Sequence, residues 1–250
     1  MEVKAVSEFD LLVGWKSSVD ETIKEIKIDE YTGKHERRVV KKEYLNNPAR
    51  GVTELITAIT LKFGPYSEMR RQQAGKLKVC DRNLIMLHLR LLDDETFKYI
   101  HECPTCQHKS NKTVNLMSMP VNDCEEPERD VELLSPYKQE DAEFKFARIT
   151  MPNGDCQVSF FDALNNQDPV AIKMAMIKHC LLGVKSNKKD SLTRVNPLQF
   201  FDNVKSATVT RLIEEINKLS EGVGPQLRVT DTCDNCGHAE EREVPIALFF

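Results

Sequence analysis

Several motifs that mark common enzyme classes are missing from this sequence. It contains no Walker loop, no glycine-rich dinucleotide turn and no nucleophile elbow. The absence of these motifs disfavours the nucleotide-dependent enzymes and hydrolases that they identify. No pairing of a nucleophile with a neighbouring base appears elsewhere, and the acidic clusters read as solvated surface.

Long hydrophobic runs are also missing. No apolar stretch approaches the ~18–20 residues that a membrane-spanning helix needs. Residues 1–12 lack the basic start and the apolar stretch of a secretory signal. The sequence therefore predicts that the protein has no membrane partner and is made and kept in a reducing cytoplasm.

An excess of positive charge is missing as well. The 250 residues include 35 Lys and Arg against 39 Asp and Glu, which gives a net charge of −4. This balance argues against a chain whose whole surface binds a phosphate backbone. Hydrophobic residues make up 40% of the chain, enough for the core of one large or two small domains.

Cysteine carries the strongest positive signal. Four of the eight cysteines form two C-x-x-C pairs, Cys103 with Cys106 and Cys233 with Cys236. Two such turns supply the four soft ligands that tetrahedral zinc prefers, and disulfides are disfavoured in a reducing compartment. We expect one structural Zn²⁺ on these four residues. An iron–sulfur cluster on the same thiolates is the main alternative, and a redox C-x-x-C fits less well because strands rather than a helix follow.

The two cysteine segments resemble each other. Residues 103–116 read CPTCQHKSNKTVNL and residues 233–246 read CDNCGHAEEREVPI. Each has a histidine five positions after its first cysteine, His108 and His238, which we expect beside the metal rather than on it. The pattern indicates one unit used twice: an incoming strand, a metal knuckle and an outgoing strand. Gly237 follows the second pair, where knuckles often need a positive φ, and Gln107 takes that place in the first.

The predicted fold class is α+β. Two zinc-knuckle β-hairpins form one four-cysteine site, with a β-hairpin and a helical block between them. The turn Asn153-Gly154 predicts the intervening hairpin, with strands over residues 143–151 and 155–161. Helices are expected after the caps Asp168 and Asn196 and from Ser206.

The expected organisation has four parts. Residues 1–50 form an N-terminal extension or arm, and residues 51–120 form a strand and helix segment with the first knuckle. Residues 121–142, rich in acids and proline, form a linker. Residues 143–250 hold the hairpin, the helices and the second knuckle, which closes on the first through the metal. A metal with four protein ligands has no open position for a reactive water, so we expect no enzymatic activity at this site.

The order of these features resembles a known family. Residues 81–90 read DRNLIMLHLR, followed by C-P-x-C, a V-N-L strand, an N-G hairpin with helices behind it, a late C-x-x-C and a Phe-Phe ending. This order resembles the baseplate hub and hub-assembly proteins of T4-like contractile-tailed bacteriophages. The resemblance implies a structural or assembly protein in the tail baseplate of the virion, present in the host cytoplasm during assembly. Its partners would be other baseplate hub subunits.

Two further interpretations concern binding. Phe249 and Phe250 are candidate docking residues, because two terminal phenylalanines are poorly suited to water. The alternative function is a nucleic-acid-binding zinc protein, suggested by Lys109, Lys112 and a basic run at 34–42. Glutamates beside the second knuckle argue against it, so nucleic acid is the less favoured partner.

Overall fold

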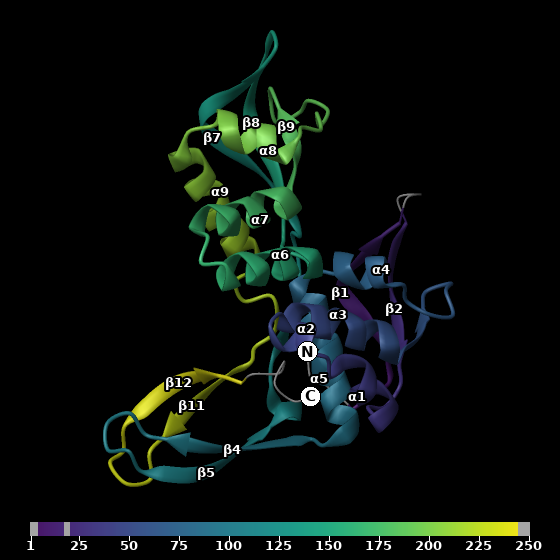
Figure 1. Cartoon of the computed structure of the whole chain (residues 1–250), viewed down its shortest axis with the longest axis vertical. Helices are drawn as coiled ribbons and strands as arrows, with labels where there is room; N and C mark the ends of the chain where they lie inside the picture. The colour runs from purple at the N-terminus through teal and green to yellow at the C-terminus, as the bar shows by residue number, and fades with distance from the viewer. Residues whose placement is uncertain (1–4, 18–20, 245–250) are drawn as a thin grey trace.

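The computed structural model describes residues 5–17 and 21–244 and has the mixed helix and sheet content that was expected. Figure 1 shows an elongated molecule in three parts. One part holds the N-terminal strands and helices, a second holds a sheet covered by helices, and two hairpins project together from the side. The helices within the described ranges are all too short or too polar to span a membrane.

The N-terminal part is built around a three-stranded antiparallel sheet in the order β1-β2-β3. Its elements are β1 (Glu8–Lys16), β2 (Thr22–Ile28), α1 (Gly33–Val39), α2 (Lys42–Leu45), α3 (Pro48–Ile59), β3 (Thr60–Phe63), α4 (Arg71–Lys76) and α5 (Val79–Asp93). Leu11, Ile26 and Ile28 of the first two strands are buried in the core. The prediction of an N-terminal arm over residues 1–50 is therefore wrong for these two strands. The polar character of residues 1–50, including the basic run at 34–42, concealed the apolar residues of the strands.

Helix α5 lies at the centre of this part and is buried on several faces. Asp81 lies in the first turn of this helix, which begins at Val79. The Asp81 carboxylate accepts hydrogen bonds from the backbone N–H groups of Val13 (3.0 Å) and Gly14 (2.9 Å). These two residues lie where the register of β1 shifts against β2, so α5 fixes an irregular stretch of the first strand.

The second part is a sheet in the order β7-β8-β9, with helices packed on it. Its elements are β7 (Glu128–Gln139), β8 (Ala142–Thr150), α6 (Gly154–Asn165), α7 (Pro169–Cys180), β9 (Leu181–Lys185), α8 (Pro197–Asn203) and α9 (Ser206–Ser220). Strand β7 occupies most of the stretch predicted as a linker. The acids and Pro136 of that stretch hid the buried Val131, Leu133 and Tyr137.

The hairpin expected around Asn153-Gly154 is also wrong. The Asn153 side chain accepts a hydrogen bond from the backbone N–H of Cys156, so this dipeptide opens α6 rather than a turn. The hairpin of this part is formed by β7 and β8, and Glu140 has a positive φ at its tip. The helices expected after Asp168 and Asn196 and from Ser206 are confirmed as α7, α8 and α9.

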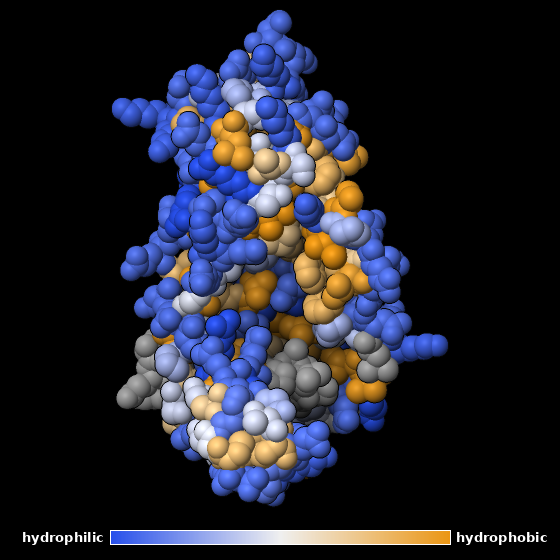
Figure 2. Space-filling model, turned by 90° about the vertical axis from the view of Figure 1, so that its left-hand side faces the viewer, coloured by the Kyte–Doolittle hydropathy of each residue, from blue (hydrophilic) through white to orange (hydrophobic). Residues whose placement is uncertain are grey.

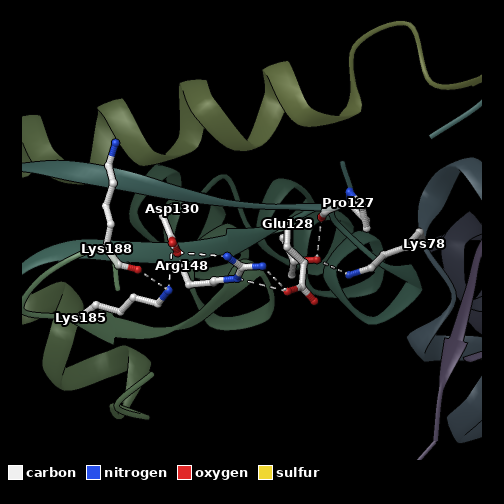
Figure 3. A network of polar contacts seen from close by, with 8 residues as sticks. Lys78, Pro127, Glu128, Asp130, Arg148, Lys185 and Lys188 are labelled. Atoms are coloured by element: carbon white, nitrogen blue, oxygen red, sulfur yellow. Dashed lines mark hydrogen bonds and ion pairs between the residues drawn. The ribbon is translucent and has the colours of Figure 1, made fainter. Parts of the chain in front are cut away.

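A polar network runs along the sheet and reaches α5 (Figure 3). The Lys78 ammonium, at the start of α5, donates to Thr150 Oγ1 over 2.6 Å and to the carbonyl of Met151 over 3.0 Å. Arg148 of β8 pairs with Glu128 and Asp130 of β7. Lys185 of β9 pairs with the same Asp130 over 2.9 Å. These contacts join the three strands to one another and to the central helix.

One hydrophobic core continues through the N-terminal part and the sheet with its helices. Figure 2 views the molecule from the side of the projecting hairpins and shows a largely hydrophilic surface with hydrophobic groups above the hairpins. Exposed apolar side chains on the helices of this region include Leu164 of α6, Val170 of α7 and Leu198 of α8.

Candidate metal centre

The two projecting hairpins have the same construction. The first pairs β4 (Thr96–Glu102) with β5 (Lys109–Asn115), and the second pairs β11 (Arg228–Thr232) with β12 (Ala239–Glu243). The predicted unit of strand, knuckle and strand is confirmed in both. The outgoing strands begin at Lys109 and Ala239, shortly after the second cysteine of each pair.

Each knuckle is closed by the same backbone hydrogen bonds. The N–H of Cys103 donates to the carbonyl of His108 over 3.0 Å, and the N–H of Cys233 donates to the carbonyl of His238 over 2.8 Å. The residue after each second cysteine has a positive φ, 58° at Gln107 and 72° at Gly237. The similar φ angles confirm the positive φ expected after the second cysteine of each pair. Gln107 therefore adopts a backbone conformation that glycine adopts more readily.

A small sheet at their base brings the hairpins together. Strand β6 (Val121–Asn122) follows the first hairpin through the short 3-10 helix η1 (Leu116–Ser118), and it pairs with β10 (Gly224–Pro225), which precedes the second. Gly224 has a φ of +87°, and a Cβ there would lie 3.0 Å from the Cβ of Cys80 on α5. This close approach requires glycine and fixes both hairpins against the central helix.

The four predicted cysteine ligands meet at the tips of the hairpins. The sulfur atoms of Cys103, Cys106, Cys233 and Cys236 all lie within 4.8 Å of one another. Cys103 Sγ is 3.7 Å from Cys236 Sγ, and Cys106 Sγ is 3.6 Å from Cys233 Sγ. A tetrahedral metal with sulfur ligands at ~2.3 Å separates neighbouring sulfurs by about 3.8 Å. The spacing of the sulfurs therefore fits a single metal ion.

The protonation of the sulfurs also fits a cation. The Asn235 side-chain amide donates to Cys106 Sγ over 3.6 Å and lowers the pKa of this thiol. At Cys236 the backbone N–H of His238 favours the thiolate, but the neighbouring cysteine sulfurs, Cys106 first, outweigh it and raise the pKa to about 12. Four sulfurs this close repel one another as thiolates, and a divalent cation between them removes the repulsion.

A buried polar group lies beneath the sulfurs. His101 of β4 is fully buried, with its Nδ1 at 3.5 Å from Asp231 Oδ2 and 3.6 Å from Glu240 Oε1. His101 has no role in the prediction from the sequence. If the match between the two cysteine segments is extended by two residues towards the N-terminus, His101 aligns with Asp231. This alignment is the signal in the sequence that could have predicted their contact.

Two side-chain contacts tie one hairpin to the other. The Tyr99 hydroxyl of β4 hydrogen-bonds to Asp231 of β11. The Lys112 ammonium of β5 donates to Asp234 Oδ1 over 2.7 Å and to the carbonyl of Thr232 over 2.9 Å. The hairpins therefore contact each other through both their strands and their cysteines.

The remaining residues singled out from the sequence lie outside the cluster. His108 is exposed and His238 half-buried, as expected beside the knuckles. Cys80, Cys156 and Cys180 are buried elsewhere and Cys124 is half-buried. The basic residues Lys109 and Lys112 pair with acids on their own or the facing hairpin. Phe249 and Phe250 lie outside the described residues.

Comparison with known proteins bears on the role of this arrangement. No curated protein and no solved structure shows a significant match to the chain. The family model described as T4 bacteriophage base plate protein matches residues 14–247, which include both hairpins and all four clustered cysteines. Because this match covers most of the chain, the protein belongs to the family of T4 bacteriophage base plate proteins.

Proposed function

We propose that the chain is a non-enzymatic structural or assembly component of the baseplate hub, in which one Zn²⁺ bound by Cys103, Cys106, Cys233 and Cys236 fastens two hairpins together. One observation carries the metal part of this proposal. Cysteines that lie 127 and 133 positions apart in the sequence bring four sulfurs within 4.8 Å of one another. Membership of a structural family supports the non-enzymatic role.

Zinc at this site would supply a cross-link. Four cysteine sulfurs complete a tetrahedron, so the residues leave no position for a reactive water or substrate. Cys103 and Cys233 are buried, and the exposed Cys236 and half-buried Cys106 close the outer side. An iron–sulfur cluster is the alternative occupant. With zinc bound, the purified protein is expected to show no visible absorption. A broad visible absorption band together with stoichiometric iron would identify the occupant as an iron–sulfur cluster instead.

The hairpins need such a cross-link because they bury few side chains. Residues of β5 and β12 alternate between exposed and half-buried. Two-stranded sheets are at best marginally stable alone in water. A metal that joins the two pairs of strands therefore supports the shape of an arm that projects from the body of the molecule.

Assembly with other hub subunits is supported by the surface of α6, α7 and α8. Val170 is 58% exposed, Leu198 is 55% exposed and Leu164 is 47% exposed. Exposed apolar side chains on neighbouring helices are common at protein contacts. Phe249 and Phe250 remain proposed docking residues for the same partners. The protein would act in the virion tail baseplate and in the host cytoplasm during assembly.

Mass spectrometry of purified phage particles and of baseplate intermediates from infected cells tests this role. We expect the chain in particles if it is a permanent subunit, and only in intermediates if it assists assembly. Its absence from both would contradict the proposal.

Nucleic-acid binding is the second proposed function, and the charge of the hairpins gives it little support. The lysines near the first knuckle are paired with acids, and Lys34 of the basic run pairs with Asp29. Titration with DNA and RNA at low salt decides between the two roles, because phosphate contacts give an affinity that falls steeply with salt. Salt-dependent binding would favour the second function, and a flat titration would remove it.

A further inference from the structure

A cleft on the N-terminal part lies away from the paired hairpins. Its volume is about 740 Å³, within the usual range for ligand sites, and it opens where β1, α3, α4 and α6 meet. Trp15 of β1 and Tyr66, which follows β3, contribute aromatic rings to it. Neither the cysteine cluster nor the family match gives this cleft a role.

The charge of the cleft is opposite to the charge of the whole chain. Four cationic side chains and one acidic side chain line it: Arg50, Arg70, Arg71, Lys76 and Asp155. Three of these cations already pair with carboxylates: Arg50 with Asp162 and Arg71 with Glu54, neither of which lines the cleft, and Lys76 with Asp155 inside it. Over the described residues, no carboxylate lies within ion-pair distance of the exposed Arg70.

A buried cation behind the cleft adds to its positive potential. The Arg82 side chain of α5 is 1% exposed, and burial lowers its pKa to about 10, so it stays charged at neutral pH. Its guanidinium donates only to neutral oxygens: the carbonyls of Ala49 and Ala74, Thr53 Oγ1 and Gln157 Oε1. Thr53 also lines the cleft. A charge in a low-dielectric interior without a bonded carboxylate acts over a longer range than one in water.

The aromatic rings give the cleft an apolar side. Trp15 and Tyr66 meet edge to face with their ring centroids 6.5 Å apart, and Tyr66 is 41% exposed. An open aromatic surface beside cations suits a segment that carries an apolar side chain between carboxylates.

We propose that this cleft binds an acidic peptide segment of a neighbouring baseplate protein, with one carboxylate on Arg70, a second that shares Lys76 with Asp155, and an apolar side chain on Trp15 and Tyr66. The partner class rests on the proposed function. A peptide is favoured over nucleic acid because Asp155 lies in the lining and three of the four cations of the cleft are already paired with carboxylates. A nucleic-acid site usually extends as a basic stripe, and the net charge of −4 repels a long polyanion.

The sole tryptophan of the chain makes the test direct, since Trp15 lies in the cleft. The full-length protein is titrated with a short acidic peptide that has a central phenylalanine, and tryptophan fluorescence is recorded. A peptide with lysine in place of each acid and a single-stranded oligonucleotide are titrated in parallel. We expect a saturable change with the acidic peptide alone, which weakens as salt rises.

Variants locate the binding. Arg70→Glu should raise the apparent Kd by about tenfold or more, the effect of placing a like charge against the peptide. The matched charge reversal Arg194→Glu, at an exposed position after β9, should leave the Kd unchanged. Thermal melts of both variants show that the fold is intact.

Three outcomes overturn the docking proposal: no response to the acidic peptide, an equal response to the lysine peptide or the oligonucleotide, or equal affinity in Arg70→Glu. If the peptide fails while the chain is found in baseplate intermediates, the docking proposal alone falls. If the peptide binds while the chain is absent from particles and intermediates, the proposed function falls instead.

Discussion

Two adjacent charged residues on α5 are buried and hold different parts of the molecule in place. Asp81 accepts hydrogen bonds from backbone N–H groups of β1, while Arg82 donates hydrogen bonds to residues of α3, α4 and α6. Burial raises the pKa of Asp81, and the N–H groups of Val13 and Gly14 oppose this rise. Charged residues at buried positions need many hydrogen bonds, so this pair fixes the arrangement of the N-terminal part.

Arg82→Lys should destabilise the protein although it keeps the charge. A lysine cannot reproduce the planar fork that binds carbonyls on two helices, and Ala49 and Ala74 would each lose a buried donor. We expect a loss of about 2–4 kcal/mol in urea unfolding, from unsatisfied buried oxygens. Lys76→Arg, at an exposed site on α4, is the control. If Arg82→Lys were as stable as the parent protein, the hydrogen bonds of Arg82 would not be what holds these helices together.

Gln107 and Gly237 offer a reciprocal test of the knuckle geometry. Both have a positive φ, which costs glutamine about 1 kcal/mol relative to glycine. Gln107→Gly should therefore tighten metal binding severalfold, and Gly237→Gln should weaken it by a similar factor. Competition with a chromophoric chelator measures both. Shifts of the same sign in the two variants would show that the two knuckles are not equivalent.

Elements differ in how much of them the sequence predicts. The strands around the cysteines and the caps of α7 and α8 were predictable, because side chains at fixed spacings determine them locally. Strand β7 was not, since Pro136 lies in a register shift of the strand pair between Glu132 and Tyr137 and acidic residues precede and follow that shift. Asn153-Gly154 is typical of a turn and of a helix start alike, and only the packing of α6 on α7 and α3 decides between them.

The same distinction applies to the metal centre. The residue types and their spacing predicted the four sulfurs, and the repeated segment predicted that the two hairpins would look alike. The β6 and β10 pair that brings the hairpins together is only two residues long on each side and has no periodicity to detect. The contact between His101, Asp231 and Glu240 depends on that convergence, so it could not be read from one hairpin alone.

Substitution of Gly224 tests whether the pairing of β6 with β10 brings the two hairpins together. Gly224→Ala would place a Cβ 3.0 Å from Cys80 Cβ with a φ of +87°, and we expect a loss of about 1–3 kcal/mol in thermal or urea unfolding. Gly222→Ala is the control, since Gly222 also has a positive φ, +70°, but no atom within 4 Å of an added Cβ. Equal losses in the two variants would mean that the contact with α5 does not constrain β10.

At the scale of the whole molecule, the proposed metal would support the hairpins more than the body. The core that joins the N-terminal part to the β7-β8-β9 sheet is continuous without the cysteines. We therefore expect loss of the proposed metal to open the paired hairpins and to leave the body folded.

Hydrogen exchange with and without a strong chelator measures this difference. Amides of β4, β5, β11 and β12 should lose protection when the metal is removed, while amides of α5 and α9 keep theirs. Loss of protection throughout the chain would contradict local opening and indicate a single cooperative unit.

Elemental analysis of the purified full-length protein tests the central claim most directly. We expect about one zinc per chain in the parent and in the control Cys124→Ser, whose thiol lies outside the cluster. Cys103→Ser and Cys233→Ser should lose it, because each removes a sulfur from a closed set of four. A parent protein without zinc or iron, or Cys103→Ser and Cys233→Ser proteins with the full metal content, would contradict a shared metal as the link between the hairpins.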